Sequence, residues 1–142
     1  MNRMVLIVLT ILLLPLAFLS SCSRGPQKSK NVVEILYLPH PPVKAVMAQV
    51  DRVLADHRGL DVRKVSFDDS NSQALIEKYK LTGHTPIAIF IDGRDQFNVA
   101  GRQVLFRNFP KNNSFLPPGM RGNWDYKDLE AVLARRDAGS GK

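Results

Sequence analysis

The sequence is almost without cysteine, and its one thiol, Cys22, lies near the N-terminus. Residues 23–142 contain none, so this part of the chain has no disulfide framework, no thiolate metal ligand and no redox pair. An exported protein is permitted disulfides, and features described below point to export. The domain nevertheless does without them.

The chain also lacks a cluster of basic residues. Lys and Arg outnumber Asp and Glu by 20 to 13 and give a formal net charge of +7, but acidic residues are interspersed and no five basic residues follow one another. A nucleic-acid-binding domain needs a basic patch or stripe. We therefore expect no nucleic-acid partner, and we attribute the charge to a surface that lies beside anionic lipid headgroups.

Common catalytic signatures are missing as well. The sequence has no Gly-x-Ser-x-Gly elbow, no glycine-rich loop that would cradle a phosphate and no His-Glu-x-x-His motif. We therefore expect no cofactor, and the sequence does not favour an enzyme.

One long apolar stretch is present, at the N-terminus. Met4–Leu19 is apolar except for Thr10, is interrupted by Pro15 and follows the basic Arg3. Its roughly 16 residues fall short of the roughly 20 that cross a bilayer comfortably. A charged start, a short apolar core and small residues after it are typical of a signal peptide.

Leu19-Ser20-Ser21-Cys22, which follows this core, resembles the bacterial lipobox. The resemblance implies that residues 1–21 are a removed signal peptide. It also implies that the Cys22 thiol becomes lipidated and that the new amino group gains an acyl chain such as palmitate. Two or three acyl chains anchor a protein stably. The alternative is an ordinary signal peptide or an uncleaved anchor, with Cys22 uninvolved.

The residue after the cysteine bears on the membrane. Ser23, rather than Asp, follows Cys22, and in the familiar sorting pattern this favours the outer membrane of a Gram-negative cell, with the domain facing the periplasm. In a Gram-positive cell the same signal leaves the protein on the extracytoplasmic face of the cytoplasmic membrane.

The rest of the chain predicts one domain between a tether and a tail. Residues 22–31 are polar after the cysteine and form a flexible tether, whose nine residues from Ser23 reach about 15–18 Å as a random coil. Residues 32–137 form the domain, and residues 138–142 a disordered tail, with fraying expected from Asp137. About 120 mature residues suffice for one hydrophobic core and are too few for two ordinary domains.

Apolar periodicity predicts strands and helices in alternation. Strands are expected at 32–38, 60–67 (an edge strand) and 86–91 (the central strand), with two short pieces at 96–99 and 103–106. Helices are expected at 43–58, from a capping box of Ser70 and Gln73 to Tyr79, and at 126–136 with Asn123 or Asp125 as its cap. Asp92-Gly93 predicts a turn, and residues 108–122 a long irregular loop.

This β-α-β-α-β-β-α order predicts parallel crossovers followed by an antiparallel hairpin. It indicates an α/β or α+β domain, with one mixed sheet and flanking helices in three layers.

The order and one stretch of sequence resemble the thioredoxin fold. Glu77–Pro86 (EKYKLTGHTP), followed by an apolar strand and Asp92-Gly93, is similar to the second half of that family. There, a cis-proline begins the central strand, and Pro86 matches it. The resemblance covers about residues 32–136 and weakens after Gly93.

The departure from the family is in its catalytic motif. Where thioredoxins carry Cys-x-x-Cys, this chain has Pro39-His40-Pro41-Pro42, so that Pro39 and Pro42 take the cysteine positions. Thiol–disulfide exchange requires an attacking thiolate. The family's usual activity therefore does not transfer.

Three hypotheses remain for this region. In the first, the loops around it form a face that binds a peptide or an envelope protein, because proline-stiffened loops lose little entropy on binding. The candidate residues are Pro39, His40, Pro41, Pro42, His84, Thr85 and Pro86. We favour this hypothesis and predict a membrane-anchored, redox-inactive binding or accessory module.

In the second hypothesis, His40 and His84 meet in a metal-binding or hydrolytic site, to which Asp68 or Asp69 adds a carboxylate. Two histidines are too few for a closed zinc site.

In the third, the prolines only end a strand and start a helix, and the functional surface lies at the 108–122 loop. Trp124 is then more a packing residue than a ligand platform. The apolar residues of that surface are Phe109, Phe115, Leu116 and Trp124. A basic rim would consist of Arg102, Arg107, Lys111 and Arg121, and the alternative, which we favour, is that these four residues belong to an ordinary solvated face.

Overall fold

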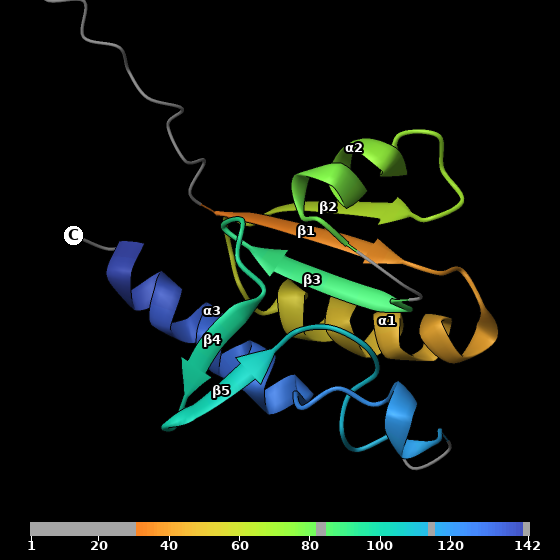
Figure 1. Ribbon diagram of the computed structural model, residues 1–142. Coiled ribbons are helices and arrows are strands. Elements are labelled where there is room, and N and C mark those ends of the chain that lie inside the picture. The colour runs from red at the N-terminus through yellow and green to blue at the C-terminus, as the bar shows by residue number, and fades with distance from the viewer. Residues whose placement is uncertain (1–30, 82–84, 114–115, 141–142) are drawn as a thin grey trace, which may run out of the picture.

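A computed structural model describes residues 31–81, 85–113 and 116–140, and these form an α/β domain (Figure 1). The predicted lipidation residue Cys22 and its tether lie outside them, apart from Asn31. Within the described ranges, no helix is long and apolar enough to cross a membrane. The elements are β1 (Val32–Tyr37), α1 (Pro41–Ala55), β2 (Asp61–Ser66), α2 (Ser72–Lys78), β3 (Ile87–Ile91), β4 (Gln96–Val99), β5 (Arg102–Leu105), the 3₁₀ helix η1 (Pro118–Met120) and α3 (Tyr126–Ser140).

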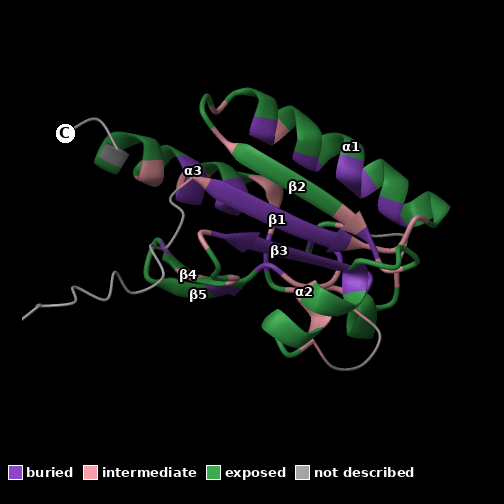
Figure 2. Ribbon diagram, turned by 90° about the horizontal axis from the view of Figure 1, so that it is seen from above, coloured by how far each residue is buried: buried purple, intermediate pink, exposed green. Residues whose placement is uncertain are grey.

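The main sheet has three strands in the order β2-β1-β3. β1 and β2 are parallel and joined through α1, whereas β3 runs antiparallel to β1. The prediction of β2 as an edge strand is confirmed, and residues 61–64 are exposed (Figure 2). Two expectations are wrong. β1 rather than β3 is central, and the connection through α2 is not a parallel crossover.

A second sheet, the hairpin of β4 and β5, stands apart from the first, so the single sheet that we expected is also wrong. The chain after β5 nevertheless covers the outer edge of β3. Ile89 N donates to Phe106 O at 2.9 Å, and Asn108 N donates to Ile87 O at 2.9 Å. β3 is therefore buried along its whole length without being a central strand (Figure 2).

Side-chain alternation along the strands divides the core between two faces. Val33 and Ile35 face the larger core, which α1 and α3 cover, and Leu36 and Phe90 face a smaller core under α2. The predicted inner face of the first long helix is confirmed, because Val43, Val46, Met47, Val50 and Leu54 are all buried. The domain thus has the expected three layers, with α2 on one side of the sheet and α1 and α3 on the other (Figure 1).

The start of α3 confirms one of its two predicted caps. Asp125 Oδ1 accepts from Asp128 N at 3.0 Å, and Asp128 Oδ2 accepts from Asp125 N at 2.9 Å, so the two residues form a reciprocal capping box. Asn123 instead binds β5, where its Oδ1 accepts from Leu105 N at 2.8 Å. The helix continues to Ser140, so residues 138–140 are helical where a tail was expected.

Two local expectations fail. The predicted capping box of Ser70 and Gln73 does not form, since α2 begins at Ser72 and the Gln73 amide donates to Glu77 Oε1 at 3.0 Å. Pro86 is not a cis-proline, because no peptide bond is cis in the part of the chain that is described. The Asp92-Gly93 turn is confirmed, with φ values of 50° and 77° that suit a tight hairpin turn.

Candidate functional site

The proline segment and the loop before β3 lie side by side, as the first hypothesis requires. Leu38 N donates to Pro86 O at 2.9 Å. Pro41 and Pro42 are the first two residues of α1, and the extended His40 precedes them without a side-chain capping bond. The segment therefore ends β1 and starts α1, as the structural hypothesis predicted, while His40, Pro41 and Pro42 remain exposed.

The two described residues on the β3 side of this face are less accessible. Pro86 is buried, and its carbonyl is already bound by Leu38. Thr85 is half-buried. His84 lies outside the described residues. The accessible part of the candidate face therefore consists of His40, Pro41 and Pro42, with Pro39 half-buried beneath them, and we call these four residues the proline turn.

The metal hypothesis gains no support from the described residues. Among them, no group of three or more His, Cys, Asp or Glu side chains is placed to hold a metal ion. Asp69 is used locally, since its Oδ2 accepts from Ser66 N at 3.0 Å in the turn before α2.

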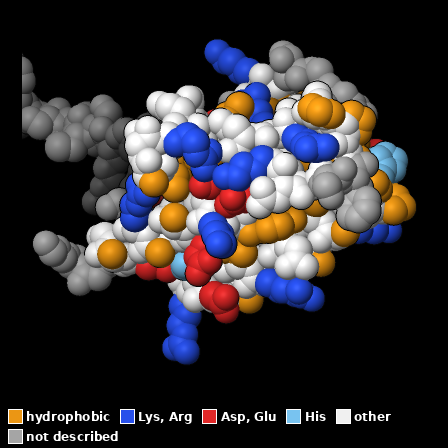
Figure 3. Space-filling model, turned by 90° about the horizontal axis from the view of Figure 1, so that it is seen from below, with side chains coloured by type: hydrophobic (Ala, Val, Ile, Leu, Met, Phe, Trp, Pro, Cys, Tyr) orange, Lys and Arg blue, Asp and Glu red, His pale blue; other side chains and the backbone are white. Residues whose placement is uncertain are grey.

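The predicted basic rim is not a free basic surface. Arg102 pairs with Asp128 at 2.7 Å, and Arg107 pairs with Asp95 at 2.5 Å. Arg121 donates to the Leu116 carbonyl, and Lys111 pairs with Asp125 at 2.8 Å. Burial raises the pKa of Asp125, but the hydrogen bond and charge of Lys111, together with backbone hydrogen bonds from the start of α3, outweigh it, and the pKa is lowered overall. In Figure 3, acidic and basic side chains lie beside one another on the visible face.

Two residues expected near this loop have clear structural roles. Trp124 is fully buried, and its Nε1 donates to the carbonyls of Arg107 and Asn108, both at 3.1 Å. This confirms it as a packing residue. Phe109 is likewise buried in the core, whereas Phe115 lies outside the described residues.

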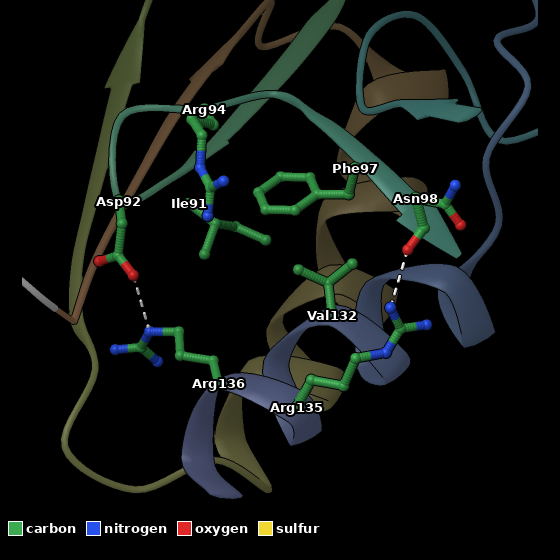
Figure 4. Close-up of a pocket in the computed structure, with 8 residues that line it drawn as sticks. All are labelled: Ile91, Asp92, Arg94, Phe97, Asn98, Val132, Arg135 and Arg136. Carbon is green, nitrogen blue, oxygen red and sulfur yellow. Dashed lines mark hydrogen bonds and ion pairs between the residues drawn. The ribbon is translucent and has the colours of Figure 1, made fainter. Parts of the chain in front are cut away.

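A pocket that the sequence did not indicate lies between the β3–β4 turn and α3 (Figure 4). Its volume is about 300 Å³. Its lining combines an apolar wall with three guanidinium groups, and we call it the arginine pocket. The lining residues are Ile91, Asp92, Arg94, Phe97, Asn98, Val132, Arg135 and Arg136.

The three arginines of the pocket differ in how they are held. Arg136 Nε pairs with Asp92 Oδ2 at 3.1 Å, and the Arg136 side chain is only 12% exposed. Arg135 donates to the Asn98 carbonyl at 2.8 Å, and Arg94 lies over the Phe97 ring at 5.1 Å. Among the ion pairs of the described chain, none joins Arg94 or Arg135 to a carboxylate. The pocket therefore carries more positive than negative charge.

Asp92 also fixes where the chain enters the domain. Its Oδ1 accepts from Asn31 N at 2.7 Å and from Val32 N at 3.0 Å. One carboxylate thus holds the first residues of the domain and, through Oδ2, an arginine of the pocket. The sequence predicted the Asp92-Gly93 turn but gave no sign that residues 94, 135 and 136 meet there, because α3 docking brings them together.

His57 joins two helices, a role that no sequence pattern indicated. Its Nδ1 lies 2.6 Å from Asp137 Oδ2, so it connects the end of α1 to α3. Its Nε2 is buried and has no hydrogen-bond partner in the part of the chain that the structure describes. A buried Nε2 is out of reach of a substrate, so this His–Asp pair is a structural contact.

Glu34 is the buried acidic residue of β1. Its Oε2 accepts hydrogen bonds from Lys78 Nζ at 2.6 Å and from the Tyr79 hydroxyl. Burial raises the pKa of Glu34, but these two hydrogen bonds and the charges of Lys78 and Arg63 together outweigh it, and the pKa lies below its usual value. Tyr79 also stacks on Phe90, with ring centroids 3.5 Å apart. The carboxylate of Glu34 is thus bound by residues at the end of α2, and this contact holds the end of α2 on the sheet.

No family model, curated protein or solved structure matches the chain. Function is therefore inferred from its own residues. Two surfaces carry groups that are accessible to a ligand or a partner. The proline turn is exposed at the start of α1, and the arginine pocket lies at the end of β3.

Proposed function

We propose that this chain is a bacterial lipoprotein, anchored through Cys22, whose domain has a thioredoxin-like topology. The domain lacks thiol oxidoreductase activity and binds a peptide or a protein of the cell envelope. In a Gram-negative cell, Ser23 favours the outer membrane, with the domain facing the periplasm. In a Gram-positive cell, the lipoprotein signal would place the domain on the extracytoplasmic face of the cytoplasmic membrane.

The strand arrangement supports the proposed topology. A parallel pair linked by α1, a third strand antiparallel to the first and helices on both faces suit the resemblance to thioredoxins. The contact between Leu38 and Pro86 brings together the proline segment after β1 and the loop before β3, the two loops that the resemblance to thioredoxins implies are neighbours. Pro86 itself adds nothing to this assignment, because its peptide bond is trans.

The chemistry of the site supports a role in binding rather than redox catalysis. Cys22 is the only cysteine in the chain, and lipidation converts its thiol into a thioether. Pro39 and Pro42 stand where the family has its cysteines, and neither offers a nucleophile. Exchange of disulfides is therefore closed to this protein.

The position of the proline turn is the observation that carries the proposal. β1 begins at Val32, next to Asn31, through which the proposed tether joins the domain, and ends beside Pro39, so the turn lies at the opposite end of the strand from Asn31 (Figure 1). Six residues of strand span about 20 Å. The turn is thus remote from the first residue of the domain, and its fixed proline backbone loses little entropy when it binds a partner.

Site-specific photocrosslinking in the native cells tests this proposal. A photoreactive benzoylphenylalanine at position 40 is expected to give a discrete crosslinked product, because His40 is exposed at the centre of the turn. The same group in place of Glu130, an exposed residue of α3, is the control and should not give that product.

Altering the turn separates specific binding from chance contact. Pro41→Ala with Pro42→Ala, made in the position-40 chain, should reduce the product several-fold while the domain stays folded, because both prolines are exposed. Equal products from positions 40 and 130, or a product indifferent to the proline changes, would contradict a binding role for this turn.

A further inference from the structure

We infer that the arginine pocket binds the phosphate of an anionic phospholipid in the membrane that carries the protein. This inference rests on the lipid anchor proposed above and adds a second contact to it. The bound phosphate would hold the arginine pocket at the lipid headgroups and turn the proline turn away from the membrane.

The charge of the pocket selects an anion. Arg94 and Arg135 reach it from the β3–β4 turn and from α3, and neither has a carboxylate partner in the ion pairs of the described chain (Figure 4). The guanidinium fork matches phosphate oxygens in two-point contacts. Arg102, Arg107 and Lys111 of the rim, by contrast, are already paired with carboxylates.

The remaining walls favour a phosphate that is attached to carbon. Ile91, Phe97 and Val132 line the pocket beside the arginines, and an apolar wall gains free energy only by covering apolar atoms. A volume of about 300 Å³ is at the small end of ligand sites. It suits a phosphate with its glycerol, leaving the acyl chains in the bilayer.

The position of the pocket decides between a lipid and a dissolved phosphate ester. Asp92 lines the pocket and holds Asn31 and Val32, so the tether enters the domain at the rim of the pocket. Nine tether residues reach about 15–18 Å. A headgroup in the anchoring leaflet therefore lies within reach, and tethering makes its effective concentration high.

The test uses the full chain in non-ionic detergent micelles and follows backbone amide signals by NMR. Dihexanoyl-phosphatidylglycerol is the probe, with dihexanoyl-phosphatidylcholine and inorganic phosphate as parallel titrations. With phosphatidylglycerol we expect saturable shifts confined to residues 91–98 and 132–136. The apparent affinity for phosphatidylcholine and for inorganic phosphate should be at least about tenfold lower.

Charge-matched variants control for general electrostatics. Arg94→Gln with Arg135→Gln should weaken binding of phosphatidylglycerol at least about tenfold. Arg52→Gln with Arg63→Gln removes the same charge from exposed positions outside the pocket and should leave the affinity within about twofold. All four side chains are exposed, so unshifted amides elsewhere will report that the fold persists.

The outcomes separate this inference from the anchor. Equal affinity for inorganic phosphate would overturn the lipid assignment, and equal weakening by both double variants would overturn the pocket as the site. Absence of shifts in a chain whose Cys22 carries lipid would overturn the inference and leave the anchor standing. If protein purified from bacterial membranes has an unmodified Cys22 and still shows the pocket shifts, the result supports the pocket and contradicts the anchor.

Discussion

At Gly122 the backbone passes so close to its neighbours that no side chain fits. A Cβ there would lie 2.2 Å from the Arg107 carbonyl oxygen and 2.9 Å from Trp124 Cδ1. The Gly122 N–H also donates to Phe109 O at 2.6 Å, so the chain cannot move away without losing that bond. Glycine is required at this position by space rather than by its backbone angles.

We predict that Gly122→Ala lowers the free energy of unfolding by about 3 kcal/mol, since buried overpacking costs about 1–3 kcal/mol and Trp124 would lose packing too. Denaturation in urea measures the change. Gly119→Ala is the matched control, because a Cβ at Gly119 meets nothing within 4 Å, and it should change stability by less than about 0.5 kcal/mol. Equal effects of the two substitutions would contradict the steric explanation.

The sequence revealed one of the two candidate sites and not the other. The proline turn was evident, because four neighbouring residues formed it. The arginine pocket was not, because Arg94 and Arg135 are far apart in the chain and ordinary as isolated residues. Of the two predicted histidines, His40 is exposed and His84 lies outside the described part, so their meeting stays a prediction.

At the scale of elements, an electrostatic contact joins the end of α2 to β1. Glu34 of β1 is 6% exposed and accepts from Lys78, which is half-exposed, and from Tyr79. The lowered pKa of Glu34 means that the folded state favours the ionised form. Its contribution to stability is therefore complete above the ordinary value of 4.5 and is lost as the pH falls through the lower folded-state pKa.

We predict that Glu34→Gln destabilises the domain by about 2 kcal/mol at pH 7, the usual cost of disrupting a charged hydrogen-bonded pair. The difference from the unaltered protein should shrink as the pH falls below 4.5. Urea denaturation over a pH series measures it. Asp51→Asn, which removes the partner of exposed Lys64, should cost less than about 1 kcal/mol. A pH-independent difference for Glu34→Gln would contradict the proposed linkage.

Element types were predictable, whereas their pairing was not. The apolar run at 86–91 correctly indicated a buried strand. An apolar sequence shows that both faces of a strand are covered, but it does not show how many strands pair with it. β3 has one full partner strand, and residues 106–108 cover its other edge. The two strand pieces at 96–99 and 103–106 were predictable, yet nothing local showed that β4 and β5 form their own sheet.

For the whole molecule, the two proposed contacts lie at opposite ends of β1. Asn31, where the proposed tether would join, and the arginine pocket are at its start, and the proline turn is at its end. A domain held at the membrane by its first end presents the second end to the aqueous space. The proposed functions of the two surfaces are thus compatible.

Everything at this scale depends on the proposed anchor at Cys22, so the decisive measurement is the intact mass of the full-length protein purified from bacterial membranes. A mature chain that begins at Cys22 and carries the mass of a diacylglyceryl group and an amide-linked acyl chain is expected, and Cys22→Ser should abolish both cleavage and lipid. A chain that retains residues 1–21, or that bears an unmodified Cys22, would contradict the lipoprotein assignment.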